Sequence, residues 1–280
     1  GGAHFSTSAI LTGATFISNT ASNEGGGVLF GTSSTALLAD TTFTGNRSGS
    51  TGGGAMFYGR AELSGVTFVN NSTTNGGGAY FGDVSVLTST TFFSNTAGGQ
   101  GGGAWFVKAA TLSDSSFVNN TASTTNGGGA VFYAAAALTG TVFDGNTAGN
   151  NGGGVYLTDS PAPIRIVNSL FARNRAGTGQ GNALYLFSFT SLSAGNTFDM
   201  IFTTIASPTL ASGSAILIRS TSYTYTANIT GTLISNYATG IQQVTAVAVN
   251  ENYNLFDGVT TPYAGVVSSG GNSITGTAAF

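Results

Sequence analysis

The residues of this sequence that could do chemistry are its carboxylates, because it contains no cysteine and only one histidine, His4. Without cysteine there is no thiolate nucleophile and no thiolate metal ligand. A glycosidase needs two carboxyl groups about 5–9.5 Å apart. Asp40 and Asp114 each precede a phenylalanine by three residues, but three copies of the repeat described below separate them, roughly 14 Å at the spacing of stacked strands. We therefore expect no catalytic site, no cofactor and no metal site.

Three arginines form the densest cluster of charge: Arg165, Arg173 and Arg175, with Asp159 close by in the sequence. Guanidinium groups bind carboxylates through charge-assisted hydrogen bonds, so this cluster could bind an anionic glycan or a carboxylate on a partner. The competing interpretation, which we favour, is a solvated turn region where the repeat becomes irregular.

Aromatic residues give a second candidate contact surface. Trp105 lies between Ala104 and Phe106, so strand alternation predicts that its side chain points outward. Tyr80 and Tyr58 are expected to flank it in adjacent copies of the repeat. Such a strip would contact a sugar or another protein chain, and the competing interpretation is incidental surface aromatics or cover by a loop. The residues of the predicted strip are Met56, Tyr80, Trp105, Val131 and Tyr156.

These residues belong to a repeat, and the repeat decides the fold. A glycine cluster followed by Ala or Val recurs with that residue at positions 3, 28, 55, 79, 104, 130 and 155, which are 24–27 residues apart. A second element, Phe-x-x-Asn, shares the period. Its phenylalanines are Phe16, Phe43, Phe68, Phe92, Phe117, Phe143 and Phe171. Its asparagines are Asn19, Asn46, Asn71, Asn95, Asn120, Asn146 and Asn174.

The repeat lacks the helix formers and charge pairs of helical repeats. Short segments rich in Phe, Val, Thr and Leu, joined by Gly and Asn turns, are typical of strands. The sequence therefore predicts an all-β fold, a right-handed parallel β-helix of about ten three-strand coils, stacked about 4.8 Å apart. Stacking would align the phenylalanines and asparagines into structural ladders. We expect the ladder asparagines in a tight turn, because Asn tolerates left-handed backbone angles.

Residues 1–280 are expected to form a single β-helix domain, with regular repeats over 1–176 and longer, degenerate coils over 177–280. Ala183 and Ala215 mark worn copies of the glycine element, and Leu233 with Asn236 marks a worn copy of Phe-x-x-Asn.

The paired signature of Gly-Gly-Ala and Phe-x-x-Asn resembles the repeats of the chlamydial polymorphic outer membrane proteins and related β-helix surface proteins. The resemblance covers residues 1–176 well and 177–260 weakly. It implies a secreted β-helix, similar to the passenger of an autotransporter, with a role in adhesion.

Composition excludes several classes of protein. Only 6% of the residues are charged and the net charge is −3, so there is no basic stripe for nucleic acid and no polybasic membrane patch. No apolar run approaches the ~18 residues of a membrane span. Glycine is abundant, with 44 of 280 residues, and the repeat explains most of it as turns.

The chain begins within a repeat, as expected either for an excerpt of a longer solenoid or for ends that stack on the next copy. Head-to-tail stacking of identical subunits generates an open filament. We therefore expect a non-enzymatic, extracellular structural or adhesive β-solenoid at the cell surface, which assembles with itself end to end. The alternatives are a passenger-type adhesin that binds host cells or glycans as a monomeric rod, and a polysaccharide lyase or glycosidase.

Overall fold

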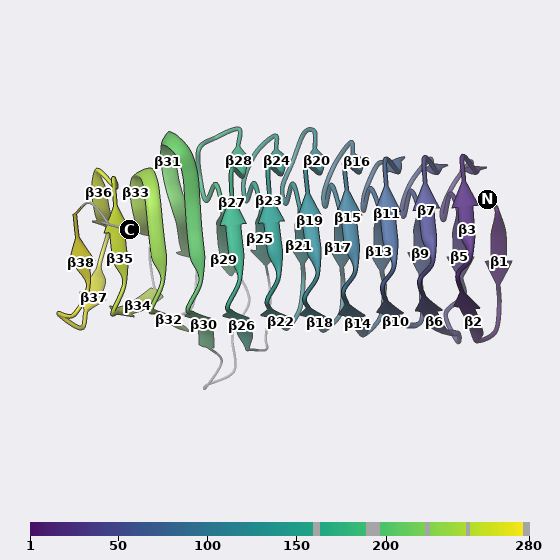
Figure 1. Cartoon of the computed structure of the whole chain (residues 1–280), viewed down its shortest axis with the longest axis horizontal. Helices are drawn as coiled ribbons and strands as arrows, with labels where there is room; N and C mark the ends of the chain where they lie inside the picture. Colours follow the sequence, from purple (N-terminus) through teal and green to yellow (C-terminus); the bar gives the residue numbers. More distant parts are fainter. Residues whose placement is uncertain (159–162, 189–196, 222–224, 245–246, 277–280) are drawn as a thin grey trace.

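The strands of this chain stack along one axis, and each repeat of the sequence makes one coil (Figure 1). The structure, a computed structural model, describes residues 1–158, 163–188, 197–221, 225–244 and 247–276. Within these residues the paired strands run parallel and no helix occurs. The predicted all-β solenoid of about ten parallel coils is confirmed.

A regular coil carries four short strands, one more than predicted. In the second coil these are β5 (Val28–Phe30), β6 (Thr35–Ala39), β7 (Thr42–Thr44) and β8 (Arg47–Ser48). The strands form three sheets of 20, 11 and 7 strands, and the largest takes two strands from each regular coil. The additional strand has only two residues, which is too short for a hydrophobic pattern to reveal.

The other strands of the regular coils fall into the same four columns. The column of β5 continues with β1 (Ala3–Phe5), β9 (Ala55–Phe57), β13 (Ala79–Phe81), β17 (Ala104–Phe106), β21 (Ala130–Phe132), β25 (Val155–Thr158) and β29 (Leu184–Ser188). The column of β7 continues with β3 (Thr15–Ile17), β11 (Thr67–Val69), β15 (Thr91–Phe93), β19 (Ser116–Val118), β23 (Val142–Asp144) and β27 (Leu170–Ala172).

The column of β6 is the 11-stranded sheet, with one strand from each coil. Its other members are β2 (Ala9–Thr12), β10 (Arg60–Ser64), β14 (Ser85–Thr88), β18 (Ala110–Ser113), β22 (Ala136–Thr139), β26 (Ile164–Val167), β30 (Thr197–Ile201), β32 (Tyr225–Thr230), β34 (Val247–Asn252) and β37 (Val267–Ser269). The column of β8 is the 7-stranded sheet, completed by β4 (Thr20–Ala21), β12 (Ser72–Thr73), β16 (Thr96–Ala97), β20 (Thr121–Ala122), β24 (Thr147–Ala148) and β28 (Arg175–Ala176).

Beyond β28 the coils change shape, and their upper parts arch outward in Figure 1. One strand of 17 residues, β31 (Thr204–Ser220), pairs with both β27 and β29. Its neighbour β33 (Leu233–Val244) pairs in turn with both β35 (Leu255–Asp257) and β36 (Thr261–Ala264), and β38 (Ile274–Thr275) follows β35. These coils lack the glycine triplet, so one long strand bends where the regular coils turn.

The core is built from columns of identical side chains. The phenylalanines of Phe-x-x-Asn stack ring on ring at 4.6–5.1 Å between centroids. A second stack runs from Phe5 to Phe132. In the arched coils the first column continues with Ile205, Ile234 and Phe256. Stacked rings bury aromatic surface while adding favourable offset contacts, so each coil stabilises the next.

The glycine triplet serves two needs at once. Gly101, the first glycine of its triplet, has a φ of 65°, a left-handed angle that costs glycine little. A Cβ added to Gly103, the third, would lie 2.6 Å from the carbonyl oxygen of Gly129 and 2.8 Å from Cδ1 of Phe117. No side chain fits there because the next coil and the phenylalanine column occupy the space.

Three expectations about backbone register need correction. The left-handed angle lies on the residue before each ladder asparagine, such as Asn70 with a φ of 53°, so the turn comes one residue earlier than expected. Val155 pairs with Leu184 rather than with Ala183, and Leu184 pairs with Ile216 rather than Ala215. The remaining register error concerns Leu233 and Asn236.

Ile234, not Leu233, takes the phenylalanine position. Asn236 is not a ladder residue, because it lies two residues after Ile234, whereas each ladder asparagine lies three residues after its phenylalanine. No glycine triplet marks the start of this coil, so the sequence does not show that its register is shifted by one residue.

Candidate functional site

The asparagine ladder runs through the interior of the regular coils. The backbone N–H and the Nδ2–H of Asn95 both donate to Oδ1 of Asn120, at 2.9 and 3.0 Å. A third bond joins Nδ2 of Asn95 to the carbonyl oxygen of Phe68. The same three bonds recur at Asn46, Asn71, Asn120 and Asn146. Each side chain thus satisfies buried polar groups of two coils, which apolar residues could not do.

The first and last residues of the ladder are different from the rest. Asn19, in the first coil, makes two bonds to Oδ1 of Asn46 and is only half-buried. Asn174 accepts both bonds from Asn146, and its Nδ2 donates to the carbonyl oxygen of Phe143 at 2.7 Å. The ladder ends at Asn174, in the coil of β28, the last strand of its sheet.

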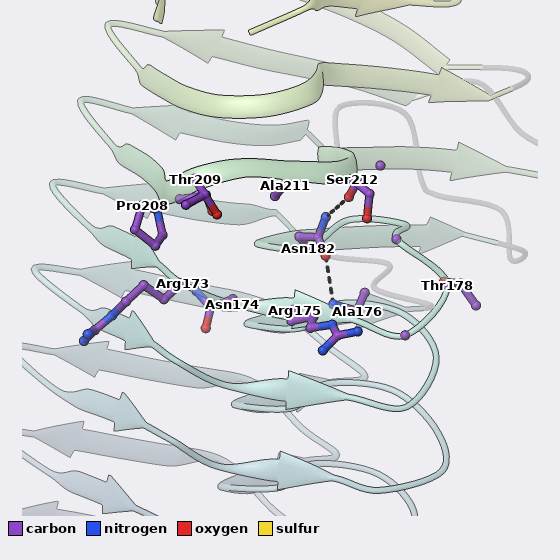
Figure 2. A pocket seen from close by; sticks show the side chains of 14 residues that line it. Arg173, Asn174, Arg175, Ala176, Thr178, Asn182, Pro208, Thr209, Ala211 and Ser212 are labelled. Carbon is purple, nitrogen blue, oxygen red and sulfur yellow. Dashed lines mark hydrogen bonds between the residues drawn. The ribbon is translucent and has the colours of Figure 1, made fainter. Parts of the chain in front are cut away.

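A pocket of about 450 Å³ opens where the ladder and this sheet end (Figure 2). One side of it is the turn and strand that carry Arg173, Asn174 and Arg175, and the opposite side is the bent part of β31 from Ser207 to Gly213. In successive regular coils the two corresponding segments would pair as neighbouring strands, but here they lie apart. The pocket therefore follows from the change in coil shape.

The structure brings two of the three candidate arginines together. Arg173 and Arg175 line the pocket, whereas Arg165 lies on β26 in another sheet and is exposed. Both Nε and Nη2 of Arg173 bond the carboxylate of Asp144, which raises the pKa of Arg173. In the described part of the chain Arg175 has no ion pair. Asp159, expected near this cluster, lies outside the described residues.

The aromatic strip is less exposed than the sequence predicts. Tyr80 pairs in register with Met56 and Trp105, and Trp105 with Val131, as the repeat requires. Tyr80 and Trp105 are half-buried, but Met56 and Val131 are buried at 2% and 0%. The expectation that the whole column forms an outward surface is therefore wrong.

Tyr156, also expected on this surface, is 9% exposed and stacks on Tyr185 at 5.4 Å between ring centroids. Val131, Tyr156, Tyr185 and Leu217 form a second hydrophobic cluster on the outside of the coils. Trp105, Tyr133 and Phe187 pack against it and shield it. The reason is that aromatic side chains two residues along the chain or one coil away cover the column.

At the N-terminal end of this cluster two tyrosines retain exposed surface. Tyr58 is 37% exposed, and its hydroxyl donates to Oε2 of Glu24 at 2.6 Å, which raises the pKa of Tyr58 to about 12. Burial first, and then the charge of Glu24, raise the pKa of Tyr80. Tyr58 is not in register with Trp105, because Met56 holds that place.

The regular coils of the chain match a known protein family. A protein-family model described as a right handed beta helix region matches residues 1–171. The chain belongs to this right-handed β-helix family. The match ends at Phe171, just before the coils change shape. No curated protein and no solved structure matches the chain.

The acids of this right-handed β-helix are spread along its length. Asp40 and Asp114 occupy turns with φ of 47° and 49°, a conformation that Asp tolerates better than most residues. Glu62 pairs with Arg60 on the surface. In the described residues no group of three His, Asp or Glu side chains could hold a metal ion. Among the described residues no helix could span a membrane.

Sequence reasoning missed one buried acid of the β-helix. Glu251 on β34 is 2% exposed, and its Oε2 accepts hydrogen bonds from Asn254 and Ser273. Burial alone would raise the pKa of Glu251, but hydrogen bonds from the surrounding side chains lower it by more. Its position in the degenerate coils gave no periodic signal.

The pocket was also missed, and the length of the repeat does not reveal it. The repeat lengthens to 32 residues between Leu184 and Ile216, against 25 between Ala130 and Val155. The added residues precede β30, because the 11 residues from Ile205 to Ile216 equal the 11 from Phe68 to Ala79. The wall of the pocket therefore differs from a regular coil in its path and not in its length.

Proposed function

We propose that this right-handed β-helix is a non-enzymatic, extracellular structural or adhesive solenoid that joins other copies of itself end to end. The observation that carries the proposal is the uniform stacking of its coils. Successive regular coils share parallel strand pairs, stacked phenylalanines and the asparagine ladder. Parallel strand pairing continues through the last coils, so two copies can meet end to end by pairing of parallel strands.

Low charge supports self-association. The chain contains seven basic and ten acidic residues, so little charge repulsion opposes close packing of copies. A head-to-tail contact uses two different surfaces and builds an open filament. The resemblance of the repeats to chlamydial polymorphic outer membrane proteins supports a location at the cell surface.

Electron microscopy of the purified chain over a range of concentrations tests the assembly. We expect rods that lengthen in steps of one molecule as concentration rises. The variant Phe16→Glu changes a half-buried ring in the first coil and should shorten the rods. The matched control Ile10→Glu, at a side chain 74% exposed on the flank of the same coil, should leave their length unchanged. Single short rods at every concentration would contradict the proposal.

A second candidate function is an adhesin that binds a cell or glycan as a monomeric rod. The observation in its favour is the half-exposed pair Tyr80 and Trp105, whose rings meet edge to face at 5.3 Å. Aromatic faces of this kind contact sugars and protein partners. In a binding assay on cells or a glycan array, Tyr80→Ala or Trp105→Ala should abolish binding. Depolymerisation of a polysaccharide, lost on changing an Asp to Asn, would instead identify an enzyme.

A further inference from the structure

The ladder asparagines share one way of binding an oxygen atom. In each coil from Asn19 to Asn146, a backbone N–H and an Nδ2–H converge on a single oxygen, the Oδ1 of the next asparagine. The two distances lie between 2.9 and 3.0 Å throughout. Six consecutive coils therefore build the same two-donor oxygen site.

The seventh copy of this oxygen site, at Asn174, faces the pocket. The local backbone keeps the ladder geometry, since the N–H of Arg175 donates to the carbonyl oxygen of Asn146 at 2.9 Å, as its counterparts do in earlier coils. Asn174 is 4% exposed, and the one bond that it donates goes to Phe143. Among the described residues no oxygen accepts from its backbone N–H or from its second amide hydrogen.

The next coil cannot supply that oxygen. Pairing between β27 and β31 stops at Ala172 and Ala206. Pro208 then stands three residues after Ile205, where a ladder asparagine would be, and the chain bends away from β28 (Figure 2). The nearby Asn182 is already engaged, because its Oδ1 accepts from the N–H of Ala176.

The charge around this point favours an anion. Arg175 lines the pocket, is exposed and has no ion pair in the described part of the chain. The positive charge of Arg173 is already balanced by Asp144. No acidic residue lines the pocket. A ligand oxygen bound here would thus meet two N–H donors, in a pocket whose lining carries positive charge and no negative charge.

We propose that the pocket binds a carboxylate, with one carboxylate oxygen in the position that Oδ1 of the next asparagine holds elsewhere in the ladder. That oxygen accepts from the backbone N–H and the Nδ2–H of Asn174. The exposed guanidinium of Arg175, one residue along the chain, supplies positive charge near the carboxylate. Paired backbone and amide N–H groups are a recurring way to hold anionic oxygens.

The size of the pocket limits the ligand. A volume of about 450 Å³ lies in the range of small-molecule sites and fits one or two sugar rings or amino-acid residues. The carboxylate could come from an acidic sugar or from an acidic residue of a peptide. Neither source requires the chain to form filaments, so this site is independent of the proposed function.

Titrations followed by nuclear magnetic resonance of the ¹⁵N-labelled chain test the site. Glucuronate and N-acetyl-aspartate methylamide are the two carboxylate probes, and they distinguish a sugar from a peptide source. Glucose and N-acetyl-asparagine methylamide are their neutral counterparts. We expect the backbone and Nδ2 amide signals of Asn174 to shift with at least one carboxylate probe, and its affinity to exceed that of its neutral counterpart about tenfold or more.

Two matched variants separate the site from general attraction of anions. Arg175→Gln should weaken carboxylate binding about tenfold, the loss expected for one charge-assisted contact. Arg47→Gln removes an exposed arginine from the same strand column, next to Asn46, whose two N–H donors already bond Asn71. It should leave binding unchanged. Equal effects of both variants, equal affinity for charged and neutral probes, or no shift at Asn174 would overturn the proposal.

Discussion

Replacing Asn95 by alanine removes one asparagine from the middle of the ladder, and the structure predicts its cost. Oδ1 of Asn95 accepts the backbone N–H and the Nδ2–H of Asn71, at 3.0 Å each. In the variant both donors stay buried without an acceptor, and each such group costs on the order of 1–3 kcal/mol. We therefore expect the free energy of unfolding to fall by about 2–6 kcal/mol.

The matched control is Asn19→Ala. Oδ1 of Asn19 accepts no bond from the described residues, and Oδ1 of Asn46 keeps the backbone N–H of Asn19 after the change. No buried group loses its only partner, so the cost should be about 1 kcal/mol, as for one ordinary hydrogen bond. Urea unfolding followed by circular dichroism measures both variants. Equal costs for the two variants would refute the argument from unpaired donors.

Asn95→Asp separates the acceptor from the donor role. The aspartate keeps an oxygen for Asn71 but loses the Nδ2–H groups and places a carboxylate 3.0 Å from Oδ1 of Asn120. Burial and this oxygen should raise the pKa of the new carboxyl in the folded state. The folded state then binds the proton more tightly than the unfolded chain, so the variant should gain stability as pH falls and lose it as pH rises. A cost independent of pH between 4 and 8 would contradict the expected burial.

Three further predictions concern other parts of the solenoid. Gly103→Ala should lower the free energy of unfolding by about 1–3 kcal/mol through overpacking, and the melting temperature with it. Its control is Gly98→Ala, whose Cβ would meet nothing closer than 3.9 Å and which should leave the melting temperature nearly unchanged. Phe106→Ala should cost about 3–5 kcal/mol in urea unfolding, because its ring stacks at 4.7 Å on both sides; a cost below 1 kcal/mol would show that the column repacks. The lowered pKa of Glu251 means that its contribution to the free energy of unfolding is present at neutral pH and is lost as pH falls below the ordinary pKa of 4.5. Glu251→Gln should therefore flatten the loss of stability in acid, and an unchanged acid profile would count against that role.

The sequence was sufficient to predict most of the fold because stacking makes structure and repeat coincide. The phenylalanine and asparagine columns could be read directly, since a residue in one coil meets the same residue in the next. The two-residue strand at β8 could not, because it carries no alternating pattern. The shift from Ala183 to Leu184 was missed because no glycine triplet marks the phase there.

The candidate surfaces were harder to predict because burial depends on side chains that the repeat does not specify. Alternation correctly gives the outward direction of Trp105 and its register with Tyr80. It cannot show that Tyr185 and Phe187, from a later coil, cover the end of that column. The pocket beside Arg175 depends on where β31 bends, which only the three-dimensional path of the chain reveals.

The asparagine ladder also has a direction. In the bonds between successive asparagines, the N–H groups point toward the C-terminal coils and the accepting oxygens toward the N-terminal coils. Only the second Nδ2–H donates back to the preceding coil. Aligned amide groups add their dipoles, as peptide groups do along an α-helix, and hydrogen bonds in a chain polarise one another. The solenoid thus builds from side chains a dipole that its parallel strands do not supply, and the positive pole of that dipole is at Asn174.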